Sequence, residues 1–472
     1  MMWVVLGHSF STNLIGGVVN PLDTLEWVKQ PYSIYVTSAP ITVDKFLLLS
    51  GILLVYTVAG KMGRETLLKN IHLFYLNRLL RLFPILATAV LATASVFHHV
   101  ADGPQWQLFV RKVYNCRTYW WSTLLHVQNY MNASYMCLGH TWYIAVDVQL
   151  HIISPLVLYW VLTSKRAAWY GLTAALVTSL TAATIFNAAW GFKSSAIQAS
   201  IENDLNYNRY YYINTLCRAP PFFVGMIYGY LLYTLQDTQI RIKRPILLLA
   251  WSLWFGVVST VLYLTYPMQQ AEWEHPVLDV FINSFMRPVW GLAIGWMIFA
   301  CAKGYGGPIN WFLSLRAWKA PSRLSYAAYV LHYPLLFVVN CTALAPVYFS
   351  DGPFVSPINW FLSLRAWKAP SRLSYAAYVL HYPLLFVVNC TALAPVYFSD
   401  GPFIFKFFAD FTVAAIASLI ATILIDAPCS TLIKIAMGAG SNKAIKASTE
   451  NNTKEHSVES VPTCDILNRK TT

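Results

Sequence analysis

The chain has 472 residues, of which 57% are hydrophobic and only 11% are charged. Because a soluble domain carries about 25% charged residues, this composition excludes a soluble globular protein and indicates a polytopic membrane protein. The net charge of +13 does not indicate nucleic-acid binding, since the basic residues fall in short clusters between apolar runs, as in the positive-inside pattern of membrane proteins.

The first apolar run carries a Gly-His-Ser step and ends near Val19. Only seven residues precede His8, whereas about 20 apolar residues are needed to cross a hydrocarbon core. We therefore expect the natural chain to have an earlier part, and we expect no cleavable signal peptide, because a basic n-region and a small-residue cleavage site are missing. A histidine in a membrane-length segment is costly, so His8 is a candidate functional residue. The alternative is a helix-end histidine bonded to a neighbouring helix.

Further apolar runs predict membrane-spanning helices, with basic residues after every second one. The expected spans cover residues 41–59, 79–97, 142–162, 168–190, 220–235, 245–266 and 288–302. Clusters such as Lys61 with Arg64, and Arg241 with Lys243, mark the loops that we expect in the cytosol. The protein is therefore expected to be a multi-pass protein of the plasma membrane or the endoplasmic reticulum.

The long loop between residues 98 and 140 falls on the opposite, exterior or luminal side. It contains Asn132 in a glycosylation acceptor sequence, and Cys116 and Cys137, which could form a disulfide in an oxidising compartment. The eight cysteines show no CxxC pair and no His/Cys cluster at metal-ligand spacing, so no structural zinc site is expected.

Residues 308–354 recur without a change as residues 357–403. Sequence drift would have marked an ancient structural repeat, so we interpret the copy as a duplicated exon or a gene-model error. Each copy holds one candidate span, at about residues 324–347 and 373–396, and a second copy would move the basic residues that follow to the exterior. With one copy removed, the count becomes ten spans and the C-terminus lies in the cytosol.

These patterns predict an all-α fold, a polytopic transmembrane helix bundle of about ten spans plus one from the duplication. We expect the transmembrane domain to cover residues 1–429, with its last span at residues 405–425. The polar residues 430–472 are expected to form a disordered cytosolic tail.

Seven short motifs then follow one another in an order that is typical of one family. They are residues 3–9, 45–51, 78–84, 140–149, 218–221 with Gly225 and Gly229, 287–290 and 322–332. On these motifs the chain resembles the acyltransferase-3 superfamily of integral membrane proteins and, within it, the animal branch called nose-resistant-to-fluoxetine proteins. The resemblance extends from Trp3 to about Pro428.

The chain also departs from the family pattern. Family members carry an arginine on the first helix upstream of the histidine, and the animal branch has a cysteine-rich exterior domain before that; both are missing here. The Glu-x-Pro of the family is represented by Asp426-Ala427-Pro428, and the single terminal Ser-Tyr…His helix of the family is present twice.

The resemblance implies transfer of an acyl group from acyl-CoA, as co-substrate, to a hydroxyl of a lipid or a small hydrophobic acceptor. Such a reaction needs a base for the proton of the acceptor, and a histidine suits that role at neutral pH, so His8 is the expected catalytic residue. Arg78 and Arg81 share one helical face at the expected cytosolic mouth of the third span. They could hold the phosphates of acyl-CoA; the alternative is ordinary anchoring by snorkelled side chains.

Other polar residues are expected to face the bundle interior, because an unpartnered charge in a span is costly. Asp147 and His151, at i and i+4, could form a proton relay or an interhelical tie, and we favour the tie. Gly225 and Gly229 form a GxxxG motif that predicts close helix packing. The full set of expected interior residues is Ser50, Asp147, Gln149, His151, Arg218, Arg287 and His332. Arg218 and Arg287, at the mouths of their spans, could line an exterior vestibule or contact lipid headgroups.

Two alternative functions remain. The protein could be a carrier of lipids or hydrophobic drugs with the same fold, or an inactive fragment of the family. A transporter usually shows inverted repeats and broken helices at the midplane, and we find neither in the sequence, which favours the enzyme. The expected partners are membrane lipid and a hydrophobic small-molecule acceptor, without nucleic acid, a bound cofactor or a metal.

Overall fold

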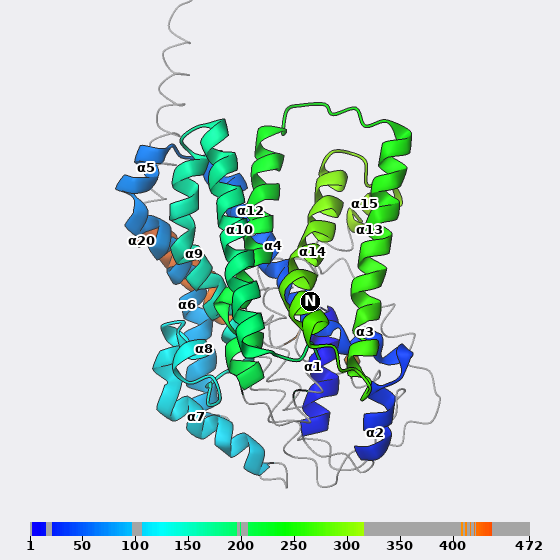
Figure 1. Ribbon diagram of the computed structural model, residues 1–472. Helices are drawn as coiled ribbons and strands as arrows, with labels where there is room; N and C mark the ends of the chain where they lie inside the picture. Colours follow the sequence, from blue (N-terminus) through cyan, green and yellow to red (C-terminus); the bar gives the residue numbers. More distant parts are fainter. Residues whose placement is uncertain are drawn as a thin grey trace, which may run out of the picture.

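The computed structural model describes residues 2–15, 21–96, 106–195, 199, 206–315, 407–408, 411–412, 416, 420 and 422–436. All regular elements in these ranges are helices (Figure 1). The expected all-α fold is therefore confirmed. The elements up to the middle of the chain are α1 (Met2–Ile15), α2 (Pro21–Val28), η1 (Pro31–Ser33), α3 (Ile34–Thr37), η2 (Ala39–Ile41), α4 (Thr42–Ala59), α5 (Arg64–Lys69), α6 (Ile71–Ser95), α7 (Trp106–Leu124), α8 (Gln128–Met131), η4 (Gly139–Thr141), α9 (Trp142–Val161) and α10 (Lys165–Trp190). The elements that follow are η5 (Tyr207–Tyr212), α12 (Thr215–Thr234), α13 (Arg244–Leu264), η6 (Pro267–Gln269), α14 (Pro276–Ala302), α15 (Gly307–Leu313), η10 (Thr422–Asp426) and α20 (Ala427–Ala436).

Within the described part of the chain, six helical segments are long and apolar enough to cross a membrane. They are Pro31–Ala59, Ile71–Ser95, Gly139–Val161, Lys165–Trp190, Arg244–Gln269 and Pro276–Ala302. The chain is therefore a multi-pass membrane protein. Most of the exact repeat, both of its candidate spans and His332 lie outside the described residues, so the count of ten spans stays a prediction. Helix α15 covers the beginning of the first copy.

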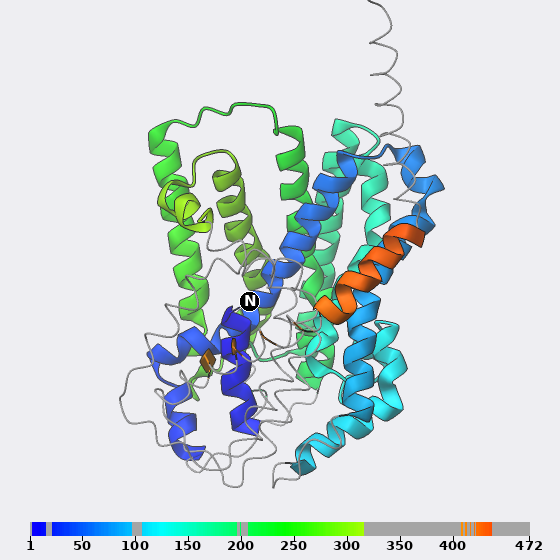
Figure 2. The same ribbon diagram turned by 180° about the vertical axis from the view of Figure 1, so that it is seen from behind.

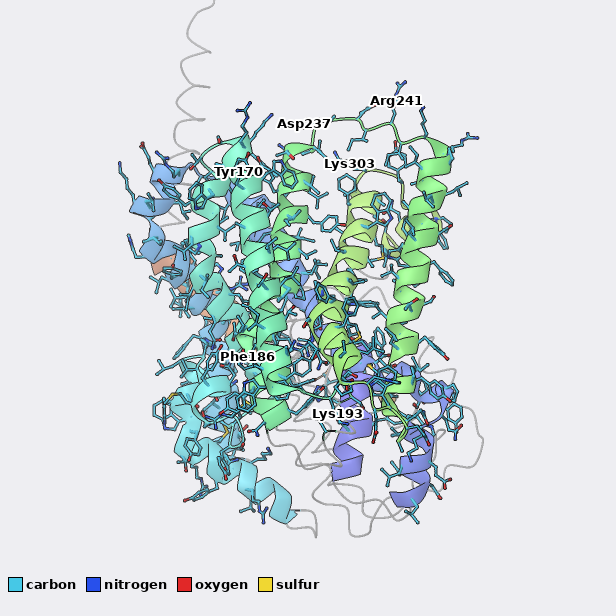
Figure 3. The ribbon with its side chains drawn as sticks, in the orientation of Figure 1. Tyr170, Phe186, Lys193, Asp237, Arg241 and Lys303 are labelled. Carbon is cyan, nitrogen blue, oxygen red and sulfur yellow. A yellow bond between two sulfur atoms is a disulfide. The ribbon has the colours of Figure 1, made fainter. Side chains whose placement is uncertain are left out.

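The two ends of the bundle differ in composition. Tyr170, Asp237, Arg241 and Lys303 lie together at one end of the bundle, and Lys193 lies at the other end (Figure 3). The first end carries the basic loops, whereas α1, α2, α7 and α8 gather at the second (Figure 1). The basic loops thus share one side, as the positive-inside pattern predicts. We refer to this end as the basic end and to the opposite end as the exterior end.

Helices α4 and α12 form the tightest contact of the bundle, because glycines line both sides of it. A Cβ atom on Gly225 would lie 2.1 Å from the backbone oxygen of Leu48, and one on Gly229 would lie 2.5 Å from that of Ile52. From the other side, a Cβ on Gly51 would lie 2.2 Å from the oxygen of Phe222. The close packing predicted from the GxxxG motif is confirmed.

Three helices begin earlier than hydropathy predicts: α6 at Ile71, α12 at Thr215 and α14 at Pro276. The first four turns of α14 show why. Asp279, Asn283 and Arg287 recur every four residues, and all three are buried. A polar stripe that faces the protein interior lowers the mean hydropathy of a helix without ending it.

Residues expected in loops also contain helices at the exterior end. Helix α7 occupies much of the loop expected between residues 98 and 140, and its Cys116 forms a disulfide with Cys137. Helices α2 and α3 lie between the first apolar run, which ends near Val19, and the span expected from residue 41. Near the other terminus, α20 runs past residue 429, the expected end of the domain, because apolar residues continue to Ile435. Figure 2 shows α20, in orange, beside α6.

Candidate functional site

A buried cluster of three charges lies where the first turns of α4 and α12 meet the interior of α14. Asp44 is fully buried, and the side chain of Arg218 is only 1% exposed. Arg218 donates from Nη1 to both carboxylate oxygens of Asp44, at 2.9 and 3.0 Å. The Nε atom of Arg287 lies 3.9 Å from Oδ2 of the same carboxylate. These three residues are called the exterior charge cluster below.

A proline of α12 helps to place Arg287, and a carbonyl just before α12 helps to place Arg218. A proline has no N–H and therefore leaves the carbonyl four residues earlier in a helix without its usual donor. Pro221 frees the carbonyl of Cys217 in this way, and Arg287 donates to it from Nη1 at 3.2 Å. Arg218 donates from Nε to the carbonyl of Tyr212 at 2.8 Å. Both guanidinium groups are thus fixed by backbone oxygens as well as by Asp44.

Aromatic rings surround the exterior charge cluster. The guanidinium carbon of Arg218 lies 4.9 Å from the ring centroid of Trp142 and 4.8 Å from that of Tyr212. That of Arg287 lies 4.2 Å from the ring of Tyr211. Stacking of this kind favours a cation over a ring face, and it is stronger away from water.

A pocket of about 90 Å³ adjoins the exterior charge cluster. Its lining includes all three charged residues together with exterior segments, such as Ser38 before η2 and Gln269 at the end of η6. Because a single water needs only about 10–15 Å³, the pocket has room for a group larger than a water molecule.

A second polar cluster lies near the middle of the bundle, between α4, α6 and α9. Arg78 forms an ion pair with Asp147 from Nη2, and the same nitrogen donates to Oγ of Ser50 at 3.0 Å. Ser50 and Asp44 are both on α4, so the rise of the helix separates the two clusters by about 9 Å. In this second cluster, the structure brings together three of the sequence-predicted residues, Arg78, Asp147 and Ser50.

The tie expected between Asp147 and His151 is not the one observed. The partner of Asp147 comes from α6, whereas the ring of His151 stacks on Phe74 with centroids 4.3 Å apart. Spacing on one helix shows which residues could meet but not which side chain of a neighbouring helix competes for them. An arginine satisfies a buried carboxylate better than a histidine does, because it is always charged and offers several donors.

Gln149 belongs to a hydrogen-bond network with the exterior loops. Its Nε2 donates to Oδ1 of Asn129 at 2.8 Å and to the carbonyl of His126 at 2.7 Å. Thr215 donates to its Oε1. His126, outside the spanning helices, has a positive φ of 58° and a pKa that burial lowers to about 4. This network fastens the α7–α8 region to α9 and α12.

His8 lies on α1, away from the arginines of α6. Helix α1 packs against η2 and α3, where a Cβ on Gly7 would lie 2.6 Å from the Cβ of Ala39. The His8 side chain is half-buried, and its Nδ1 is shielded from solvent. Figures 1 and 2 show α6 beside α7 and α9 and apart from α1. The structure therefore does not place His8 and Arg78 in one contact.

The remaining predicted residues occupy several environments. Arg81 is exposed among the described residues, in the interior of α6 rather than at its mouth. Arg218 and Arg287 are buried rather than at a headgroup surface, and Arg287 lies in the interior of α14. Asn132 is buried and donates from Nδ2 to the carbonyl of Tyr135 at 3.1 Å, so a glycan on that nitrogen would displace this bond.

Sequence reasoning missed Asp44 as a site residue, although Asp44 lies near the start of the apolar run expected to span residues 41–59. The signal was available, because a carboxylate in an apolar run requires a partner. Arg218 and Arg287 were the unassigned cations on the same side of the membrane. Tyr211 and Tyr212 precede the span and gave no comparable signal, since aromatic residues are common at membrane interfaces.

Comparison with known proteins gives a consistent result. Residues 1–364 match the acyltransferase domain family Acyl_transf_3. The chain is 27% identical to nose resistant to fluoxetine protein 6 of Caenorhabditis elegans, over 74% of this chain and 45% of that protein. It is 21% identical to regulator of hypoxia-inducible factor 1 of the same species, over 72% of this chain and 69% of that protein. No solved structure matches the chain.

The chain thus spans less than half the length of the first of these relatives. The family match nevertheless covers well over half of this chain, from its first residue through every helix that holds the two polar clusters. Together with the multi-pass helical fold, this match identifies the chain as a member of the acyltransferase-3 family.

Proposed function

We propose that the protein is a membrane O-acyltransferase. In this proposal, it moves an acyl group from acyl-CoA to a hydroxyl of a lipid or a small hydrophobic acceptor. The observation that carries the proposal is the match to the acyltransferase domain over residues 1–364. The bundle supports it, because polar side chains from several helices meet inside an apolar body, where a hydrophobic acceptor and a thioester could both be held.

His8 is the proposed general base. Its ring would take the proton of the acceptor hydroxyl as that oxygen attacks the thioester carbonyl. The carbon–sulfur bond then breaks, CoA leaves as a thiolate, and the proton passes from the histidine to the sulfur. The products are the acceptor ester and CoA, so the step needs no oxidant or metal.

Arg78 and Arg81 are the proposed residues for the phosphates of the acyl donor. Arg81 is exposed among the described residues, and a guanidinium binds phosphate bidentately. The side chain of Arg78 is 28% exposed while its Nη2 contacts Asp147 and Ser50. Part of the Arg78 side chain is thus accessible to a phosphate while its ion pair with the buried carboxylate of Asp147 is kept.

The His8→Ala variant tests this proposal. In phospholipid nanodiscs, acyl-CoA-dependent release of CoA should fall by about 10²–10⁴-fold, the range expected for loss of a general base. His275→Ala is the matched control, because that histidine is exposed at the exterior end, and it should keep full activity. If His8→Ala releases CoA as fast as the unchanged protein, His8 is not the base. If the purified protein moves a lipid across the membrane without releasing CoA, it is a carrier.

A further inference from the structure

The exterior charge cluster contains more positive than negative charge. Asp44 is the only carboxylate among the described residues that line the adjoining pocket, and it faces both Arg218 and Arg287. The pair of Asp44 and Arg218 is close, whereas Arg287 lies 3.9 Å from the same carboxylate. The described lining therefore has a surplus of one positive charge. Burying such a surplus is costly unless an anion compensates it.

The tyrosines of the pocket do not supply that negative charge. Burial raises the pKa of Tyr211 and of Tyr212, although the nearby Arg218 and Arg287 act in the opposite direction. Both residues precede α12 in η5, outside the spanning helices. Their phenol groups stay neutral at physiological pH, so they can donate hydrogen bonds but cannot balance a guanidinium group.

Arg218, which lines the pocket, has one guanidinium nitrogen with donor capacity to spare. Nη2 of Arg218 is buried and makes no hydrogen bond to the described residues, although the Tyr212 phenol lies close to this guanidinium group. Leaving a buried charged donor without a partner costs more than an ordinary hydrogen bond contributes. Tyr211, Met268 and Met286 add apolar surface to the same lining. The pocket thus offers a cationic donor beside a wall that suits a hydrophobic body.

We propose that this pocket, the exterior anion pocket, binds the singly charged head group of an amphiphile, either a carboxylate or a phosphodiester. One negative charge would neutralise the surplus, Nη2 of Arg218 would donate to it, and the apolar body would lie against the methionine and aromatic side chains. The inference goes beyond acyl transfer and stands whether or not the chain is an enzyme, because it depends only on the charges and the lining of the pocket.

Calorimetric titration of the full chain in phosphatidylcholine nanodiscs tests the proposal. Octanoate is the probe, octanol has the same body without the charge, and acetate has the same charge without the body. Octanoate should bind at a saturable site about tenfold or more tightly than octanol or acetate, since charge-assisted hydrogen bonds are strong. Equal affinity for octanoate and octanol would overturn the proposal without any variant.

Variants then assign the binding to the surplus charge. Arg287→Gln removes the surplus and should weaken octanoate about tenfold or more, while Arg287→Lys keeps the charge and should retain most of the affinity. The double variant Arg287→Gln with Asp44→Asn restores a surplus of one and should recover binding. If Arg287 served only to pack against its neighbours, Asp44→Asn would not restore octanoate binding to Arg287→Gln. A folded double variant that still fails to bind octanoate would therefore contradict the proposal.

A final arm distinguishes the two sources of the anion. Nanodiscs that contain phosphatidylglycerol offer a phosphodiester head group at high local concentration. If that lipid fills the exterior anion pocket, the apparent Kd of octanoate should rise in these discs for the unchanged protein. If octanoate binds equally well in both kinds of disc, the occupant is a carboxylate amphiphile. In Arg287→Gln, the lipid composition should make no difference in either case.

Discussion

Replacing Gly225 by alanine places a methyl carbon 2.1 Å from the backbone oxygen of Leu48. Ordinary contacts of a Cβ atom begin near 3.4 Å, so α4 and α12 must separate by roughly 1 Å, and backbone atoms on both sides leave no side chain that could simply rotate away. Overpacking of this kind costs about 1–3 kcal/mol. The higher helix propensity of alanine returns up to about 1 kcal/mol, so a net loss of stability is expected.

Gly256→Ala is the matched control for this prediction. Gly256 lies within α13, and a Cβ atom there would meet nothing within 4 Å. The same substitution should therefore be neutral or stabilising by up to about 1 kcal/mol. Thermal unfolding of both variants in one detergent, followed by loss of the monodisperse peak, gives the comparison. If Gly225→Ala unfolds at the same temperature as Gly256→Ala, α4 and α12 do not pack as closely as the structure shows.

Three further predictions concern stability. Arg218→Met leaves Asp44 buried without its close partner and should cost about 3–5 kcal/mol in unfolding free energy. Adding Asp44→Asn should recover part of this lost stability. A double variant that is no more stable than Arg218→Met would contradict the ion pair. Cys116→Ser removes the disulfide to Cys137, which closes a loop with a sequence separation of 21. This loss should cost about 3 kcal/mol of unfolding free energy. Equal Tm values of the unchanged protein with and without reductant would refute the prediction. The pKa of His126 falls to about 4 on folding, whereas its pKa in the unfolded chain is near 6.5. The contribution of the neutral His126 to folding stability is therefore fully present above pH 6.5 and is lost as the pH falls towards 4. About 2 kcal/mol should be lost between pH 7.5 and pH 5, and this loss should be absent in His126→Asn; identical pH profiles of Tm would contradict it.

Features encoded by short, local patterns could be predicted from the sequence. The all-α bundle followed from apolar runs, and the α4–α12 contact followed from Gly225 and Gly229, because small residues one helical turn apart have few other uses in a span. The α14 start at Pro276 could not be found in the same way. Its buried Asp279 and Asn283 face the protein rather than lipid, and a hydropathy average does not distinguish these two environments.

Partners that lie far apart in the sequence were the harder part of the site. Asp44 and Arg218 are 174 positions apart, and no spacing rule connects them. The i, i+4 rule suggested His151 for Asp147, whereas Arg78 on α6 is the partner. Each buried charge could be predicted to need a partner. Which opposite charge supplies it depends on the packing of helices, which a single sequence does not contain.

The proposed activity of this chain is the transfer of acyl groups from acyl-CoA to a hydroxyl. The most direct measurement uses the purified chain in nanodiscs with a deuterium-labelled acyl-CoA and a mixture of lipid and small hydrophobic alcohols, followed by mass spectrometry of the extract. The proposal predicts a labelled ester that accumulates in step with free CoA and that His8→Ala does not form. Release of CoA with only labelled free fatty acid would show hydrolysis instead of transfer, and the absence of both products would contradict the claim for this chain.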